Sequence, residues 1–151
     1  MVAGLKTHII ATMCLRLSSV FLLAGFALFA ADPAGLVVWP KGVAPGGTGV
    51  KFENHGLSVS HRDKSGIPEM HEKQTDIFVV QSGEAVLLLG GEIEGIKTES
   101  PGEMRGASIK NGVRKSVSAG DVVHIPAKMP HQFFLEPGKQ ITYFVVKVNS
   151  L

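Results

Sequence analysis

Histidine and carboxylate side chains form two clusters with the residue types of a metal site. In the first cluster, Glu69 and His71 are two residues apart, so on a β-strand their side chains point to the same face. Asp76 opens the next strand-like run, where a short bend would bring its carboxylate alongside them. The second cluster ends at His131, which begins a strand after a turn bracketed by two prolines. Imidazole and carboxylate groups are ligands of divalent transition metals, so any metal that this chain binds would be held by histidine and carboxylate side chains.

Other reactive side chains have plainer interpretations. His55 and His61 are interpreted as structural or exposed. His124 lies on the strand that enters the proline-bracketed turn, and it points either into the core, behind the ligands, or out to solvent. No serine lies in a nucleophile-elbow pattern, and no glycine pair has the strand–loop–helix setting of a phosphate-binding loop. The candidate chemistry is therefore that of the histidines and carboxylates.

Short β-rich runs separated by glycine and proline must position these clusters. Alternating or β-branched stretches predict strands at 57–61, 76–81, 84–89, 113–117, 121–125, 132–135 and 140–148. Ser82-Gly83, between two of these runs, predicts a two-residue hairpin turn. No segment after position 32 has a sustained helical period. This pattern indicates an all-β sandwich or barrel.

A long polar segment, 90–112, interrupts the series of strands. Connections of this length are uncommon in compact domains and are often lids or binding loops, whereas the plainer interpretation is a surface insertion. Ala107-Ser108-Ile109 resembles a strand, so the segment could contain an extra hairpin. If it folds over the opening of the barrel, Arg105 could meet an anionic substrate.

The N-terminal region has the features of an export signal. Residues 1–31 have a basic start, a short apolar run and a small-residue exit, which predicts a signal peptide; an uncleaved anchor is the alternative. Its removal takes away Lys6, Arg16 and the only cysteine, Cys14, and leaves a net charge of zero. A neutral domain gives no reason to expect nucleic acid as a partner. We therefore expect a periplasmic or secreted protein, with no membrane contact after cleavage, a surface arm at 32–55 anchored by Trp39, and one domain at 56–151.

The histidine clusters, with their glycines and prolines, resemble the two conserved motifs of the cupin superfamily. The resemblance runs from about Gly56 to Val148. The positions that match are His71, Asp76, Gly83, Gly120, Pro126 and His131.

The chain departs from the family pattern at several positions. Glu69 replaces the first histidine of the first motif, and Asp76 replaces its glutamate. Asp63, Lys128 and Leu135 stand where the family has two glycines and an asparagine.

The resemblance implies a jelly-roll β-barrel of six to eight strands that binds a divalent metal through Glu69, His71, Asp76 and His131. That ligand set suits Mn, Fe, Co, Ni or Zn. An alternative is a cupin that has lost its metal, with Glu69 marking the loss.

For a small bacterial cupin with an export signal, the resemblance implies a metal-dependent enzyme acting on a small polar organic molecule. Dioxygenase, isomerase and lyase chemistry all occur on this barrel. Glu69 would be a metal ligand or, if released, a catalytic general base. The alternative is a non-catalytic module that binds a small ligand with or without metal. Small cupins often pair, so a homodimer is expected.

Overall fold

The computed structural model of the protein describes residues 34–42 and 49–150. These residues belong to one compact unit that begins at Ala34. The signal peptide predicted for residues 1–31 lies outside the described residues. Within the described ranges, no helix has the length and apolar character needed to span a membrane.

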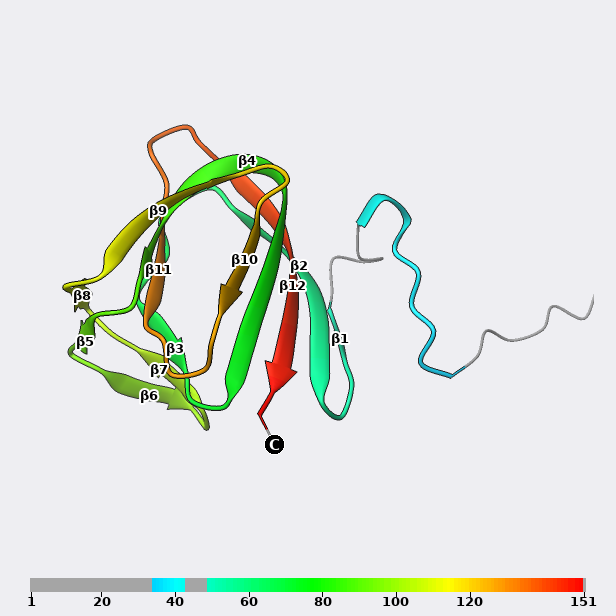
Figure 1. The fold of residues 1–151 in the computed structure, drawn as a ribbon, viewed down its shortest axis with the longest axis horizontal. Helices are drawn as coiled ribbons and strands as arrows, with labels where there is room; N and C mark the ends of the chain where they lie inside the picture. Colours follow the sequence, from blue (N-terminus) through cyan, green and yellow to red (C-terminus); the bar gives the residue numbers. More distant parts are fainter. Residues whose placement is uncertain (1–33, 43–48, 151) are drawn as a thin grey trace, which may run out of the picture. The chain divides into compact units, whose positions relative to one another are not determined.

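The described residues fold almost entirely as β-strands, as the sequence predicts (Figure 1). One short 3-10 helix, Pro40–Gly42, precedes them. The strands are β1 (Val50–Lys51), β2 (His55–Arg62), β3 (Glu69–His71), β4 (Gln74–Leu89), β5 (Glu92–Glu94), β6 (Lys97–Ser100), β7 (Glu103–Arg105), β8 (Ser108–Lys110), β9 (Val113–Ser118), β10 (Val122–Ile125), β11 (His131–Phe134) and β12 (Ile141–Asn149).

The long strand β4 belongs to two antiparallel sheets and joins them. Its first half, up to Gly83, pairs with β12 on one side and with β10 on the other. Its second half, from Glu84, pairs with β9 and β11. One sheet therefore runs β1-β2-β12-β4-β10, and the other runs β6-β7-β3-β11-β4-β9. Aromatic side chains of the two sheets meet in the interior, where the Phe133 and Tyr143 rings stack with centroids 4.9 Å apart.

The hairpin predicted at Ser82-Gly83 is wrong, because β4 continues through both residues. Gly83 has a φ of +79°, which turns the strand from one sheet into the other instead of reversing it. Tyr143 on β12 lies opposite Val80, and Thr142 lies opposite Ser82, so Gln81 is an extra residue on β4. Such a bulge bends a strand locally and increases its twist. A Ser-Gly pair between two β-rich runs therefore marks a bend here.

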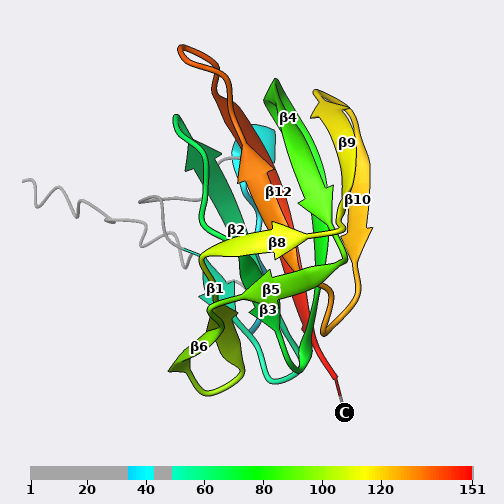
Figure 2. The same cartoon turned by 90° about the vertical axis from the view of Figure 1, so that its left-hand side faces the viewer.

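The polar segment 90–112 folds into strands, so it is not an irregular loop. Its middle part is the hairpin of β6 and β7, and β7 pairs with β3 along Glu69–His71. Its ends form a separate two-stranded sheet of β5 and β8, which runs across the direction of β4 and β12 (Figure 2). The hairpin therefore extends the second sheet beside the strand that carries two of the predicted ligands.

The interior changes from apolar to polar along its inward-facing rows of side chains. The apolar part is the core, made of Phe78, Val80, Ala85, Leu87, Val117, Ile125, Phe133, Ile141, Tyr143 and Val145. Asp76 precedes Phe78 by two residues, Lys147 follows Val145 by two, and His131 precedes Phe133 by two. These side chains share the inward parity of the core because alternate residues of a strand face the same side. Asp76 and His131 are buried, and buried polar groups require partners, so this part of the interior is the candidate site.

The segment before the barrel contacts it through few residues. The Trp39 ring meets the Phe144 ring edge-on with centroids 5.9 Å apart, and Gln81 donates a hydrogen bond to the Gly42 carbonyl. The sheet already begins at Val50, inside the range that the sequence predicts for an arm.

Candidate metal centre

Two imidazole rings approach each other from different strands of the second sheet. His71 ends β3 and His131 begins β11, and their ring centroids are 5.3 Å apart. The Nδ1 atom of His131 lies 3.1 Å from the Met129 carbonyl oxygen, which can only accept a proton, so Nδ1 carries the hydrogen. The Nδ1 atom of His71 lies 2.8 Å from a carboxylate oxygen of Glu103. Metal-binding histidines are commonly held in this way, with the outer nitrogen against a carbonyl or carboxylate and Nε2 free for the metal.

Glu69 supplies a carboxylate next to His131. Its Oε1 atom lies 3.2 Å from His131 Nε2 and 3.8 Å from Arg62 Nη2, and its other oxygen forms an ion pair with Arg105. Burial by itself raises the pKa of Glu69, but His131, Arg105 and His71 outweigh it and lower that pKa to about 2. Glu69 is therefore ionised at neutral pH.

Asp76 lies on the other side of the histidines and has a lysine as its partner. Its Oδ2 atom is 3.2 Å from His71 Nε2 and 3.8 Å from His131 Nε2. The Lys147 ammonium lies 3.2 Å from Oδ1 and also donates a hydrogen bond of 2.8 Å to His71 Nε2. Burial raises the pKa of Asp76, but the adjacent His71 and the charge of Lys147 outweigh burial, so its pKa is lowered.

The neighbours of His71 change its pKa and determine which protonation state the structure shows. Burial lowers the pKa of His71, but Asp76 and Glu103 outweigh burial and the repulsion of Lys147, so this pKa is raised. A proton on Nε2 would face the Lys147 ammonium at 2.8 Å, so the arrangement shown is that of the neutral ring.

Three of the four predicted ligands form a compact donor set. Glu69, His71 and His131 each offer a ligand atom, and these atoms all lie within 4.8 Å of one another. Asp76 lies beside this group but is ion-paired with Lys147. The buried Nε2 atom of His131 has no hydrogen-bond partner, and a lone pair that faces a carboxylate oxygen at 3.2 Å needs a cation or a proton between them. The donor set of two imidazoles and a carboxylate fits a divalent transition metal.

A small cavity opens in front of these residues. It has a volume of about 270 Å³, and the side chains of Phe78 and Tyr143 line it together with those of Glu69, His71 and Asp76. The Tyr143 hydroxyl accepts a hydrogen bond of 2.8 Å from Arg62 Nε, and the Arg62 guanidinium lies over the Phe133 ring. Both charged and aromatic side chains therefore line the cavity.

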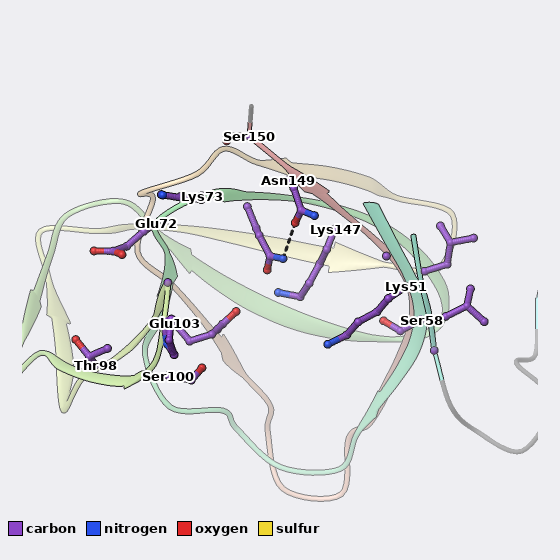
Figure 3. A pocket seen from close by; sticks show the side chains of 17 residues that line it. Lys51, Ser58, Glu72, Lys73, Thr98, Ser100, Glu103, Lys147, Asn149 and Ser150 are labelled. Carbon is purple, nitrogen blue, oxygen red and sulfur yellow. Dashed lines mark hydrogen bonds between the residues drawn. The ribbon is translucent and has the colours of Figure 1, made fainter. Parts of the chain in front are cut away.

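A larger groove of about 1010 Å³ adjoins the small cavity, and Ser58, Glu103 and Lys147 line both. Its other walls come from β1, the turn after His71, the β6–β7 hairpin and the end of β12. Figure 3 shows the side chains of Lys51 and Lys147 extending into this groove. A small polar molecule therefore has a route from solvent to His71.

Three charged residues of the site, Arg62, Glu103 and Lys147, belong to neither sequence motif and were not predicted. Lys147 has the inward parity of Tyr143 and Val145, so a charge in an otherwise apolar row could have identified it. Arg105 was expected to meet an anion if segment 90–112 folded over the opening. It lies on β7 beside β3, and its anionic partners in the structure are Glu69, Glu99 and Glu103.

The other histidines among the described residues, His55, His61 and His124, lie apart from this centre. The His55 ring contacts the Asn54 side-chain oxygen and stacks on Phe52. His61 contacts the Thr142 hydroxyl. Both are interactions expected of structural residues. His124 is exposed on β10, which settles its two interpretations in favour of solvent.

This chain is similar to known proteins in its fold and not in its sequence. No protein-family model matches the chain, and no curated protein sequence matches it. Among solved structures, a hydroquinone 1,2-dioxygenase from a Sphingomonas species, with 4-hydroxybenzoate bound, superposes with a TM-score of 0.50 at 11% identity over 67% of this chain and 63% of that one. A Klebsiella pneumoniae protein with a double-stranded β-helix domain gives 0.49 at 16% identity, over 67% and 72%. A Bacteroides fragilis cupin protein gives 0.46 at 14% identity, over 65% and 68%.

Two antiparallel sheets share β4 and enclose one core, and the candidate centre lies in that interior. The strand arrangement confirms the fold that the two sequence motifs imply. This chain has a double-stranded β-helix fold, similar to that of the hydroquinone 1,2-dioxygenase.

Proposed function

We propose that this protein binds a divalent transition metal through Glu69, His71 and His131 and acts with it on a small polar organic molecule. The observation that carries the proposal is the orientation of the two imidazoles. Each has Nδ1 close to an oxygen acceptor; Nε2 of His71 faces Asp76, and Nε2 of His131 faces Glu69. Mn, Fe, Co, Ni and Zn all accept such a donor set, and when bound the metal would polarise the substrate or activate a small molecule such as water or dioxygen.

The surroundings support a ligand role for Glu69 over that of a general base. A general base works best with a pKa near the operating pH, whereas the pKa of Glu69 is about 2. Arg105 and Arg62 neutralise its charge, and Arg105 holds the carboxylate oxygen that does not face His131. Asp76 is the fourth ligand of the proposal, available when its ion pair with Lys147 opens.

The groove supports a polar substrate. Serine, threonine, asparagine and lysine side chains line it, and it leads to the small cavity at the histidines. The aromatic rings of Phe78 and Tyr143 line that cavity, and Arg62 and Lys147, which also line it, can orient an anionic or hydroxylated group. An enzyme acting on such a molecule is the function that this geometry supports best.

Metal content tests the proposal. The full chain, purified without chelator and then reconstituted with each candidate metal, should hold about one ion per chain. His131→Ala should abolish stoichiometric metal because it removes one of two imidazole ligands. His55→Ala is the matched control, since that ring only stacks on Phe52 and contacts Asn54, and it should keep the metal. Near-ultraviolet circular dichroism checks that both variants fold, and His131→Gln serves if the alanine variant does not.

The absence of metal after reconstitution, or equal metal loss in both variants, would contradict the proposal. If the bound metal is iron, oxygen uptake measured against phenolic and keto-acid compounds separates an oxygenase from the isomerase, lyase and ligand-binding alternatives.

Export and self-association are further parts of the proposal, supported by the sequence of residues 1–31 and by the family resemblance respectively. N-terminal sequencing of the protein from the periplasm or medium tests export. Sedimentation equilibrium tests the homodimer, and a monomeric mass would reject it.

A further inference from the structure

The Lys147 ammonium occupies the nitrogen of His71 that the proposed metal requires. Its Nζ atom lies 2.8 Å from His71 Nε2, close enough to donate a strong hydrogen bond. A neutral imidazole has one lone pair, on the nitrogen that carries no hydrogen. That lone pair binds either the ammonium hydrogen or a metal at about 2 Å, but not both.

The fold holds Lys147 in this position. Lys147 lies directly opposite Asp76 in the antiparallel pair of β12 and β4, so its ammonium reaches the buried carboxylate across the ladder. Only 3% of the Asp76 side chain is exposed. A buried carboxylate without a compensating cation is costly, so in the metal-free protein Lys147 stabilises Asp76.

We propose that Lys147 is a built-in competitor of the metal: its ammonium occupies His71 Nε2 and Asp76 in the metal-free protein and must leave before the metal binds there. This inference rests on the proposed function. After the exchange Asp76 still has a cation beside it, because the metal neutralises the carboxylate in place of the departing ammonium. The competition lowers the apparent metal affinity, since part of the binding free energy is spent on breaking the contacts of Lys147.

The displaced lysine has room to move. Lys147 lines both the small cavity and the larger groove, and about a third of its side chain is exposed. On β2 its cross-strand neighbour is Gly56, where an added Cβ would meet only the Val50 carbonyl oxygen, at 3.6 Å. Figure 3 shows Lys147 beside the open space that Lys51 also faces. The ammonium can therefore enter the groove and become solvated.

Titration of the metal-free full chain with Co(II), followed by calorimetry and visible absorption, tests this proposal. Lys147→Met keeps the length of the side chain but removes its charge, and should bind Co(II) about tenfold more tightly, or better, than the wild type. Lys147→Arg keeps the charge and should bind no more tightly than the wild type. Lys51→Met is the matched control, because it removes another positive charge from the groove without touching the histidines, and it should bind like the wild type.

Two outcomes would refute the competition by Lys147 but leave the metal site itself intact, provided the wild type binds Co(II). The first is a Co(II) affinity of Lys147→Met equal to or below that of the wild type. The second is a rise in affinity of similar size in Lys147→Arg or Lys51→Met. If neither the wild type nor Lys147→Met binds Co(II), the proposed function fails as well. A crystal structure of the Co(II)-bound wild type gives a test that needs no variant. It should show Lys147 Nζ beyond hydrogen-bond distance of His71 Nε2, and an unchanged contact would refute the proposal.

Discussion

Substitution of Gly83 by alanine tests how β4 passes from one sheet to the other. Its φ is +79°, and a Cβ added there would lie 1.9 Å from the carbonyl oxygen of Gln140 and 3.0 Å from the Cα of Ile141. Gly138 has nearly the same φ, +80°, but no atom lies within 4 Å of its Cβ position. The two glycines share the conformational cost of an alanine substitution and differ in the steric contact, so each serves as the other's control.

The expected magnitudes follow from these two terms. An L-residue in the left-handed region costs about 1–2 kcal/mol, and Gly138→Ala should lower the free energy of unfolding by that amount. At Gly83 the new methyl group also collides with the backbone of the chain entering β12, and relief of such overpacking costs about 1–3 kcal/mol more. We therefore expect Gly83→Ala to lose about 2–5 kcal/mol, a large fraction of the stability of a typical domain.

Equilibrium unfolding in urea, followed by circular dichroism, measures both variants under the same conditions. Their m-values should agree, so the difference between their midpoints reports the steric term. Equal losses in the two variants would refute the reasoning. Gly83 would then have open space around it, as in the free hairpin turn that the sequence predicts.

Two further predictions concern the walls of the site. In the metal-free protein, the folded pKa of Glu69 is about 2 against an ordinary value of 4.5, so its ionisation contributes stability that is present above pH 4.5 and is lost as the pH falls towards 2. The wild type should lose about 3 kcal/mol over this range relative to Glu69→Gln, and parallel stability–pH curves for the two proteins would contradict the assignment. Tyr143→Phe keeps the stacked ring but removes the hydroxyl that accepts a hydrogen bond from Arg62. It should lower the free energy of unfolding by about 1–3 kcal/mol without changing the metal content, and unchanged stability in a urea titration would argue against that bond.

The fold could be predicted from the sequence because its signals are local. Alternation of apolar and polar residues identifies each strand of the core, and glycines and prolines mark the places where strands bend or end. Lys128, which replaces a glycine of the family motif, has a φ of +65°, in the left-handed region that favours glycine. Its N–H donates a hydrogen bond to the His71 carbonyl, which ties the turn before His131 to the first motif. The error at Ser82-Gly83 arose because a bend and a hairpin turn use the same residue types.

The sequence by itself determined most strands of the core, the shared face of Glu69 and His71 and, through the family resemblance, a donor set suited to a transition metal. Only the tertiary structure decided how these donors are neutralised. Residues far apart in the chain supply Lys147 to Asp76 and Arg105 to Glu69. Side-chain alternation fixes which face of a strand a residue occupies, but the opposing charge depends on which strands pair and on where segment 90–112 folds. Those pairings are long-range, so no local pattern in the sequence specifies them.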